Sequence, residues 1–188
     1  MTPGSLVLLH APRASAASWG DLPEMLRSYG LDVIAPDVPD GDGARYVARA
    51  SLIIAATAPA TPLVLVAHGE AGPLLPAVAL AQRAAHRKVG GYVFVDAVLP
   101  RVRREHEHDH DHEHDGAGPA PAPVPPDWPE APCGYLRTHA DRTAADQGPS
   151  AAGREQAVRQ ARLRGWPVIE HEPPAAAAQL LSELITLL

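Results

Sequence analysis

Short apolar segments alternate with helical patterns along most of the chain. Six of these segments consist almost entirely of apolar residues and are bounded by Gly, Pro or Asp. Uniformly apolar strands are typical of parallel sheets, because helices cover both faces and leave no solvated side. The strands predicted from this pattern are Ser5–Leu9, Leu31–Ala35, Pro62–Ala67, Gly91–Val95, Gly134–Arg137 and Pro167–Glu170.

Helical patterns fill the intervals between these strands. Gly30, the pair Gly90 and Gly91, and Gly165 are predicted to end three of the helices, since glycine is favoured just past a helix C-terminus. Strands that alternate with helices predict an α/β fold with about six mostly parallel strands and helices on both faces. The predicted helices are Asp21–Tyr29, Ala44–Thr57, Ala71–Lys88, Ala151–Arg164 and Pro174–Leu188.

Composition indicates one domain and excludes some functions. The 188 residues suffice for a single core. One cysteine, Cys133, excludes an intrachain disulfide and agrees with a reducing compartment, so we expect the cytoplasm. No apolar run is long enough for a secretory signal or a membrane span. Six of the 22 acidic residues lie in one run, and the other 16 balance the 16 basic residues, which disfavours nucleic-acid binding.

More specific signals occur at the ends of the predicted strands. Along the chain they are Leu6–Pro12 followed by Ser18-Trp19, Val33–Asp37, Val64–Gly72, Val93–Ala97, Gly134–Arg137 and Gly165–Val168. In this order the segments resemble successive landmarks of the α/β-hydrolase fold. The resemblance covers nearly the whole chain outside 101–126. It implies a trimmed member of that superfamily, without the usual cap domain.

The segment from Val64 to Gly72 resembles the nucleophile elbow of these hydrolases, with Gly69 in place of the serine. Serine chemistry needs a hydroxyl, a histidine base and an orienting acid. The loop that carries the base in the family is shortened here, and His171 lacks the usual preceding glycine. For the acid, Asp96 and the offset Asp141 are the alternatives. The resemblance therefore implies a degenerate member that has lost the serine triad.

Three residues remain as candidates for other catalysis, namely Glu70, Asp96 and His171. A helix N-terminal charge explains Glu70 better than catalysis does, and a strand-end or capping role is the favoured explanation of Asp96. A binding cleft does not need the hydroxyl, because backbone amides near Ala11 and Glu70 would still attract an anion or a carbonyl oxygen. The predicted ligand pocket consists of His10, Ala11, His68, Gly69, Glu70 and Asp96.

The run Glu105–Asp115 alternates five histidines with six carboxylates. In an extended chain the imidazoles share one side, and in a helix every second one would stack at i, i+4. Neutral imidazole binds Zn²⁺ and Ni²⁺, and adjacent carboxylates can orient the rings. A proline-rich stretch follows, so 101–132 is predicted to be a flexible excursion from the single domain 1–188. The predicted metal ligands are His106, His108, His110, His112 and His114. A solvated linker, or a segment whose charge changes as the histidines protonate, are the alternatives.

These signals together predict a non-catalytic α/β-hydrolase-like protein that binds Zn or Ni through its histidine-rich loop. Its former active-site cleft is either filled or retained for a small-molecule ligand. No organic cofactor is indicated. Two alternatives stay open. One is a non-serine or metal-assisted hydrolase of a small ester-like substrate. The other is an interaction module that forms a homodimer through the sheet edge left by missing first strands.

Overall fold

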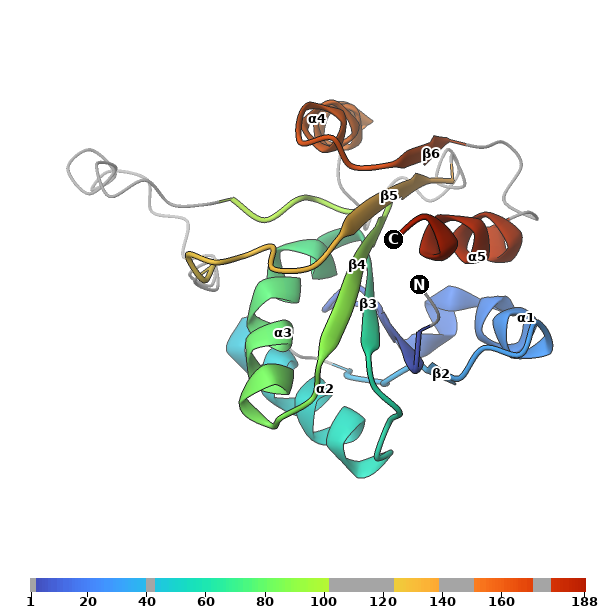
Figure 1. Ribbon diagram of the computed structural model, residues 1–188, viewed down its shortest axis with the longest axis vertical. Coiled ribbons are helices and arrows are strands. Elements are labelled where there is room, and N and C mark those ends of the chain that lie inside the picture. Colours follow the sequence, from blue (N-terminus) through green and yellow to red (C-terminus); the bar gives the residue numbers. More distant parts are fainter. Residues whose placement is uncertain (1–2, 40–42, 102–123, 139–150, 171–176) are drawn as a thin grey trace.

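The computed structural model describes residues 3–39, 43–101, 124–138, 151–170 and 177–188. Their core is a six-stranded sheet in the order β2-β1-β3-β4-β5-β6 (Figure 1). All five strand pairings are parallel, which confirms the predicted fold class. The strands are β1 (Ser5–Leu9), β2 (Val33–Ile34), β3 (Leu63–His68), β4 (Val89–Val95), β5 (Cys133–Arg137) and β6 (Val168–Glu170).

Helices cover both faces of this sheet. Side chains alternate across it: Leu6 and Leu8 join the cluster under α1 and α5, while Val7 and Leu9 join the cluster under α2, α3 and α4 (Figure 1). No helix in the described part of the chain is long and apolar enough to cross a membrane. The helices are η1 (Ala16–Trp19), α1 (Leu22–Ser28), α2 (Gly43–Ala56), η2 (Gly69–Leu74), α3 (Leu75–Ala84), α4 (Ala151–Leu163) and α5 (Ala177–Leu187).

One predicted helix boundary is wrong. The helix expected to run to Lys88 ends at Ala84, and both glycines expected to stop it lie inside β4. The chain reverses instead at His86, whose φ is 59°, and the Arg87 amide donates to the Gln82 carbonyl at 2.9 Å. A non-glycine residue in the left-handed region gives no strong sequence signal, because this conformation favours glycine or asparagine.

Residues 124–132 belong to the excursion predicted from the sequence, but the structure places Trp128 in the core. This side chain is 7% exposed and contacts the rings of Tyr92, Phe94 and Trp166. The indole rings of Trp128 and Trp166 meet edge to face at 6.3 Å between centroids. This segment therefore packs beside the end of α3 and leads directly into β5.

The two edge strands of the sheet differ. β2 has two residues and lies beside α1, from which the Arg27 guanidinium donates to the Val33 carbonyl at 2.9 Å. β6 lies at the opposite edge, next to α4 (Figure 1). Its residues are partly or fully exposed.

Candidate functional site

The carboxyl end of β3 has a sharp strand-to-helix turn, at the place where the sequence resembles a nucleophile elbow. His68 ends the strand, and Gly69 begins η2 with φ 58°. The Val98 amide donates to the Gly69 carbonyl at 3.2 Å. A Cβ at Gly72 would lie 2.0 Å from the Val98 carbonyl oxygen, so only glycine fits there. The backbone of the elbow is therefore intact, although its central residue has no side chain.

Neither Glu70 nor Cys133 takes the place of a serine at position 69. Glu70, the next residue, is exposed. Cys133 is buried at the start of β5, and desolvation raises the pKa of its thiol to about 12. Since the thiolate is the nucleophilic form, this cysteine is inert at neutral pH.

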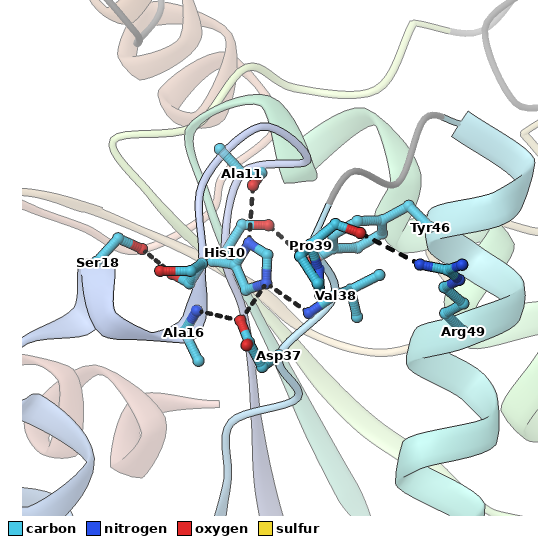
Figure 2. Close-up of polar contacts among 10 residues, drawn as sticks. His10, Ala11, Ala16, Ser18, Asp37, Val38, Pro39, Tyr46 and Arg49 are labelled. Carbon is cyan, nitrogen blue, oxygen red and sulfur yellow. Dashed lines mark hydrogen bonds and ion pairs between the residues drawn. The ribbon is translucent and has the colours of Figure 1, made fainter.

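His10, at the end of β1, is fully buried and uses both ring nitrogens (Figure 2). The Val38 amide donates to Nε2 at 3.0 Å, which requires the tautomer with its proton on Nδ1, and Nδ1 donates to the Ala11 carbonyl at 2.7 Å. The Tyr46 hydroxyl donates to the His10 carbonyl at 2.6 Å. Burial raises the pKa of this phenol, so it remains a donor. The ring thus ties β1 to the segment after β2.

Asp96, at the end of β4, has φ 46° and is 3% exposed. Both of its carboxylate oxygens accept hydrogen bonds from the Thr138 amide, at 3.1 and 3.2 Å, and one also accepts from the Thr138 hydroxyl. The carboxylate therefore joins β4 to the end of β5. This is the strand-end role that the sequence offered as an alternative to catalysis.

A cavity of about 320 Å³ lies beside the elbow, between α1 and α5. Its walls are mainly apolar, and the His68 ring meets the Trp19 indole edge to face at 5.5 Å. Trp19 is 8% exposed, and its indole nitrogen has no hydrogen-bond partner among the described residues. The described residues that line this cavity are Ser18, Trp19, Gly20, Asp21, Leu22, Met25, His68, Val95, Thr138, Ala177 and Ala178.

His68 is the one member of the predicted ligand pocket among these lining residues. The polar groups of His10 and Asp96 are hydrogen-bonded to neighbouring strand ends and do not face this cavity. The other ten lining residues, Trp19 and Thr138 among them, were not predicted for the pocket. Trp19 belongs to one of the segments that resemble the α/β-hydrolase fold. Its role in lining the cavity becomes visible only from its contact with His68 in the structure. Thr138 is a polar residue directly after a buried strand, a signal that could have identified it.

Several predicted site residues lie outside the described part of the chain. They are His106, His108, His110, His112, His114, Asp141 and His171. Within the described ranges, no group of three or more His, Cys, Asp or Glu side chains is arranged to hold a metal ion. Metal binding by the histidine-rich run therefore stays a prediction.

Comparison with solved structures agrees with the topology. No protein-family model and no curated sequence matches the chain. The structure is similar to an extracellular α/β-hydrolase from a Paenibacillus species, with TM-score 0.63, 17% identity and coverage of 97% of this chain and 99% of the other. A pyrethroid hydrolase matches with TM-score 0.65 and 16% identity over 98% of both chains. A methylesterase from Arabidopsis matches with TM-score 0.63 and 15% identity over 98% and 99%. The chain therefore has the α/β-hydrolase fold.

Proposed function

We propose that this chain is a non-catalytic protein of α/β-hydrolase fold that binds a small, mainly apolar molecule in the cavity beside the elbow. The carrying observation is Gly69, which occupies the nucleophile position of an elbow whose backbone is preserved. A binding role needs the turn and the cavity but not the hydroxyl.

The walls of the cavity favour a ligand with one hydrogen-bond acceptor on an apolar body. Leu22, Met25 and Val95 supply apolar surface. The indole N–H of Trp19 is buried without a partner among the described residues, and a carbonyl or ether oxygen would satisfy it once the ring turned toward the cavity. A volume of about 320 Å³ is at the lower end of small-molecule sites. Aromatic esters combine these properties, and esterases are among the proteins of similar structure.

Nuclear magnetic resonance of the three indole N–H groups tests this binding role. We expect methyl benzoate to shift the Trp19 resonance in the native protein, while those of Trp128 and Trp166, on the opposite face of the sheet, stay unchanged and serve as internal controls. Ala177→Phe, which fills the cavity from α5, should abolish the shift. Equal shifts of all three resonances, or none with a series of aromatic and aliphatic esters, would contradict the proposal.

Hydrolysis of p-nitrophenyl acetate tests the non-catalytic part. We expect the rate with the native protein to equal the uncatalysed rate. Gly69→Ser alone should not raise it, because a serine also needs a base and an orienting acid, and Asp96 is already hydrogen-bonded to Thr138. Turnover that persists after chelation of metals would contradict a non-catalytic role. Turnover that disappears on chelation would support the alternative, a metal-assisted hydrolase.

We further propose that the run Glu105–Asp115 binds Zn²⁺ or Ni²⁺ in the cytoplasm. The supporting observation is its alternation of five imidazoles with six carboxylates. Calorimetric titration of the untagged protein with each metal should give heats that vanish when His106, His108, His110, His112 and His114 are replaced by serine. His86→Ser, at an exposed position outside the run, is the control. Heats that survive the five replacements would refute metal binding by the run.

A further inference from the structure

β6 is an edge strand of the sheet formed by the described residues. In a parallel ladder, successive residues direct their backbone groups alternately to the two sides. The Tyr135 amide donates to the Pro167 carbonyl at 2.9 Å, and Tyr135 is in register with Val168. Pro167 and Ile169 therefore bond to β5, while the amide and carbonyl of Val168 point away from the sheet. No described strand lies on that side.

The opposite edge has a different arrangement. In the β1–β2 ladder the Leu6 amide donates to the Asp32 carbonyl, so Val33 is the residue whose backbone groups point outward. Its carbonyl already accepts the hydrogen bond from Arg27. A chain that paired at β2, as in the dimer suggested by the sequence, would have to displace this bond. At β6, no hydrogen bond from a described residue to the outward groups of Val168 would have to be displaced.

A groove of about 410 Å³ runs between β6 and α4. Its floor includes Val158, and Leu163 at its border is 81% exposed. Arg137, Arg159 and Arg162 also line it. The first and third of these arginines both contact Glu170, at 3.5 Å for Arg137. An apolar floor beside guanidinium groups suits a ligand that is both apolar and acidic.

The surface around this groove is basic in a chain that is acidic overall. Formal charge on the whole chain is −6, yet α4, the end of β5 and β6 carry more arginines than carboxylates. Among the described residues of these elements, the basic ones are Arg137, Arg154, Arg159 and Arg162, and the acidic ones are Glu155 and Glu170. Charge complementarity therefore favours an acidic partner.

We propose that β6 and the groove beside α4 bind an extended, acidic segment of a partner protein, which pairs with the Val168 edge as an added strand. The main-chain groups of Val168 supply backbone hydrogen bonds, and alternate side chains of the segment reach the arginines and the apolar floor. This surface is separate from the cavity at the elbow, so the inference does not depend on the function proposed above.

The test uses a short fluorescein-labelled peptide of alternating Glu and Val, whose binding to the full chain is followed by fluorescence anisotropy. Val168→Pro removes the outward N–H and leaves the ladder to β5 untouched, and proline is tolerated at such edge positions. We expect Val168→Pro to weaken binding about tenfold or more, equivalent to about 1.4 kcal/mol. Val168→Ala, which keeps the N–H, is the matched control and should bind within about twofold of the native protein.

Charge is tested at Arg159. Arg159→Glu should weaken binding and flatten its salt dependence, whereas Arg45→Glu, at an exposed position on α2, should leave binding unchanged. Circular dichroism and thermal unfolding of each variant establish that it is folded. Unchanged affinity in Val168→Pro would overturn strand addition. A Lys–Val peptide that binds equally well would overturn the charge argument.

Two other occupants of this surface are distinguishable. If the Glu–Val peptide binds only after residues 105–115 are deleted, the chain's own acidic run fills the groove. This result would overturn the proposal of a partner protein. If size-exclusion chromatography shows a dimer that Val168→Pro dissociates, the β6 edge binds a second copy of this chain. This result would also overturn the proposal of a partner protein.

Discussion

The ends of β1 and β3 are neighbours in the sheet, but they differ in the polar groups that they carry and in how these are hydrogen-bonded. At the end of β1, His10 is buried and both ring nitrogens are hydrogen-bonded. At the end of β3, Gly69 presents no functional group, and the adjoining cavity includes a buried indole N–H without a partner among the described residues. The His10 ring therefore contributes to stability, whereas the group absent at position 69 matters only for chemistry. Unsatisfied buried groups destabilise a fold, whereas loss of a catalytic hydroxyl does not.

The largest effect is expected for His10→Ala. It removes the acceptor of the Val38 amide and leaves a cavity under Tyr46, so we expect a loss of about 3 kcal/mol in the free energy of unfolding. Urea denaturation measures this loss, with the exposed Arg45→Ala as control. A loss below about 1 kcal/mol would mean that the region around His10 is not a structural support.

The next effect is expected for Thr138→Val, which keeps the amide donor to Asp96 but removes the hydroxyl donor. Because the acceptor is a buried carboxylate, we expect a loss of about 2 kcal/mol. Thr138→Ser restores the donor and should recover much of it. If Val and Ser variants have equal stability, the hydroxyl contributes nothing to the junction of β4 and β5.

A smaller effect is expected for Gly69→Ala. Any Cβ at φ 58° is strained, and the expected loss is about 1 kcal/mol. Gly165→Ala, at φ 72° with open space around the added Cβ, is the matched control and should cost a similar amount. If Gly69→Ala lowers the free energy of unfolding several-fold more than Gly165→Ala does, other atoms pack closely above the turn at Gly69.

The smallest effect is expected for Glu70→Gln. The side chain is exposed in the first turn of η2, so neutralising it should change stability by no more than about 0.5 kcal/mol. The same denaturation series provides the value. A larger change would show that the carboxylate contributes more to the elbow than its exposure suggests.

The sequence predicted the sheet well because strands covered on both faces need apolar residues throughout, as in Leu6–Leu9 and Leu63–Ala67. The turn at position 69 was also predicted, since Val64–Gly72 has the pattern of a strand that turns into a helix. The partners of His10 and Asp96 were not, because Val38 and Thr138 are 28 and 42 residues away along the chain. Hydrogen bonds over such separations depend on how the strand ends meet, which local patterns do not encode.

The hydrogen bond from Arg27 to Val33 also limits how molecules of this chain can assemble. Fibres grow when each molecule offers two complementary edges, so that every addition creates a new acceptor for the next. Here the outward carbonyl of β2 already accepts a hydrogen bond within the molecule, and among the described strands β6 is the other edge. A strand that added at β2 would compete with Arg27 for this carbonyl, so sheet-to-sheet growth of a fibre through both edges is disfavoured.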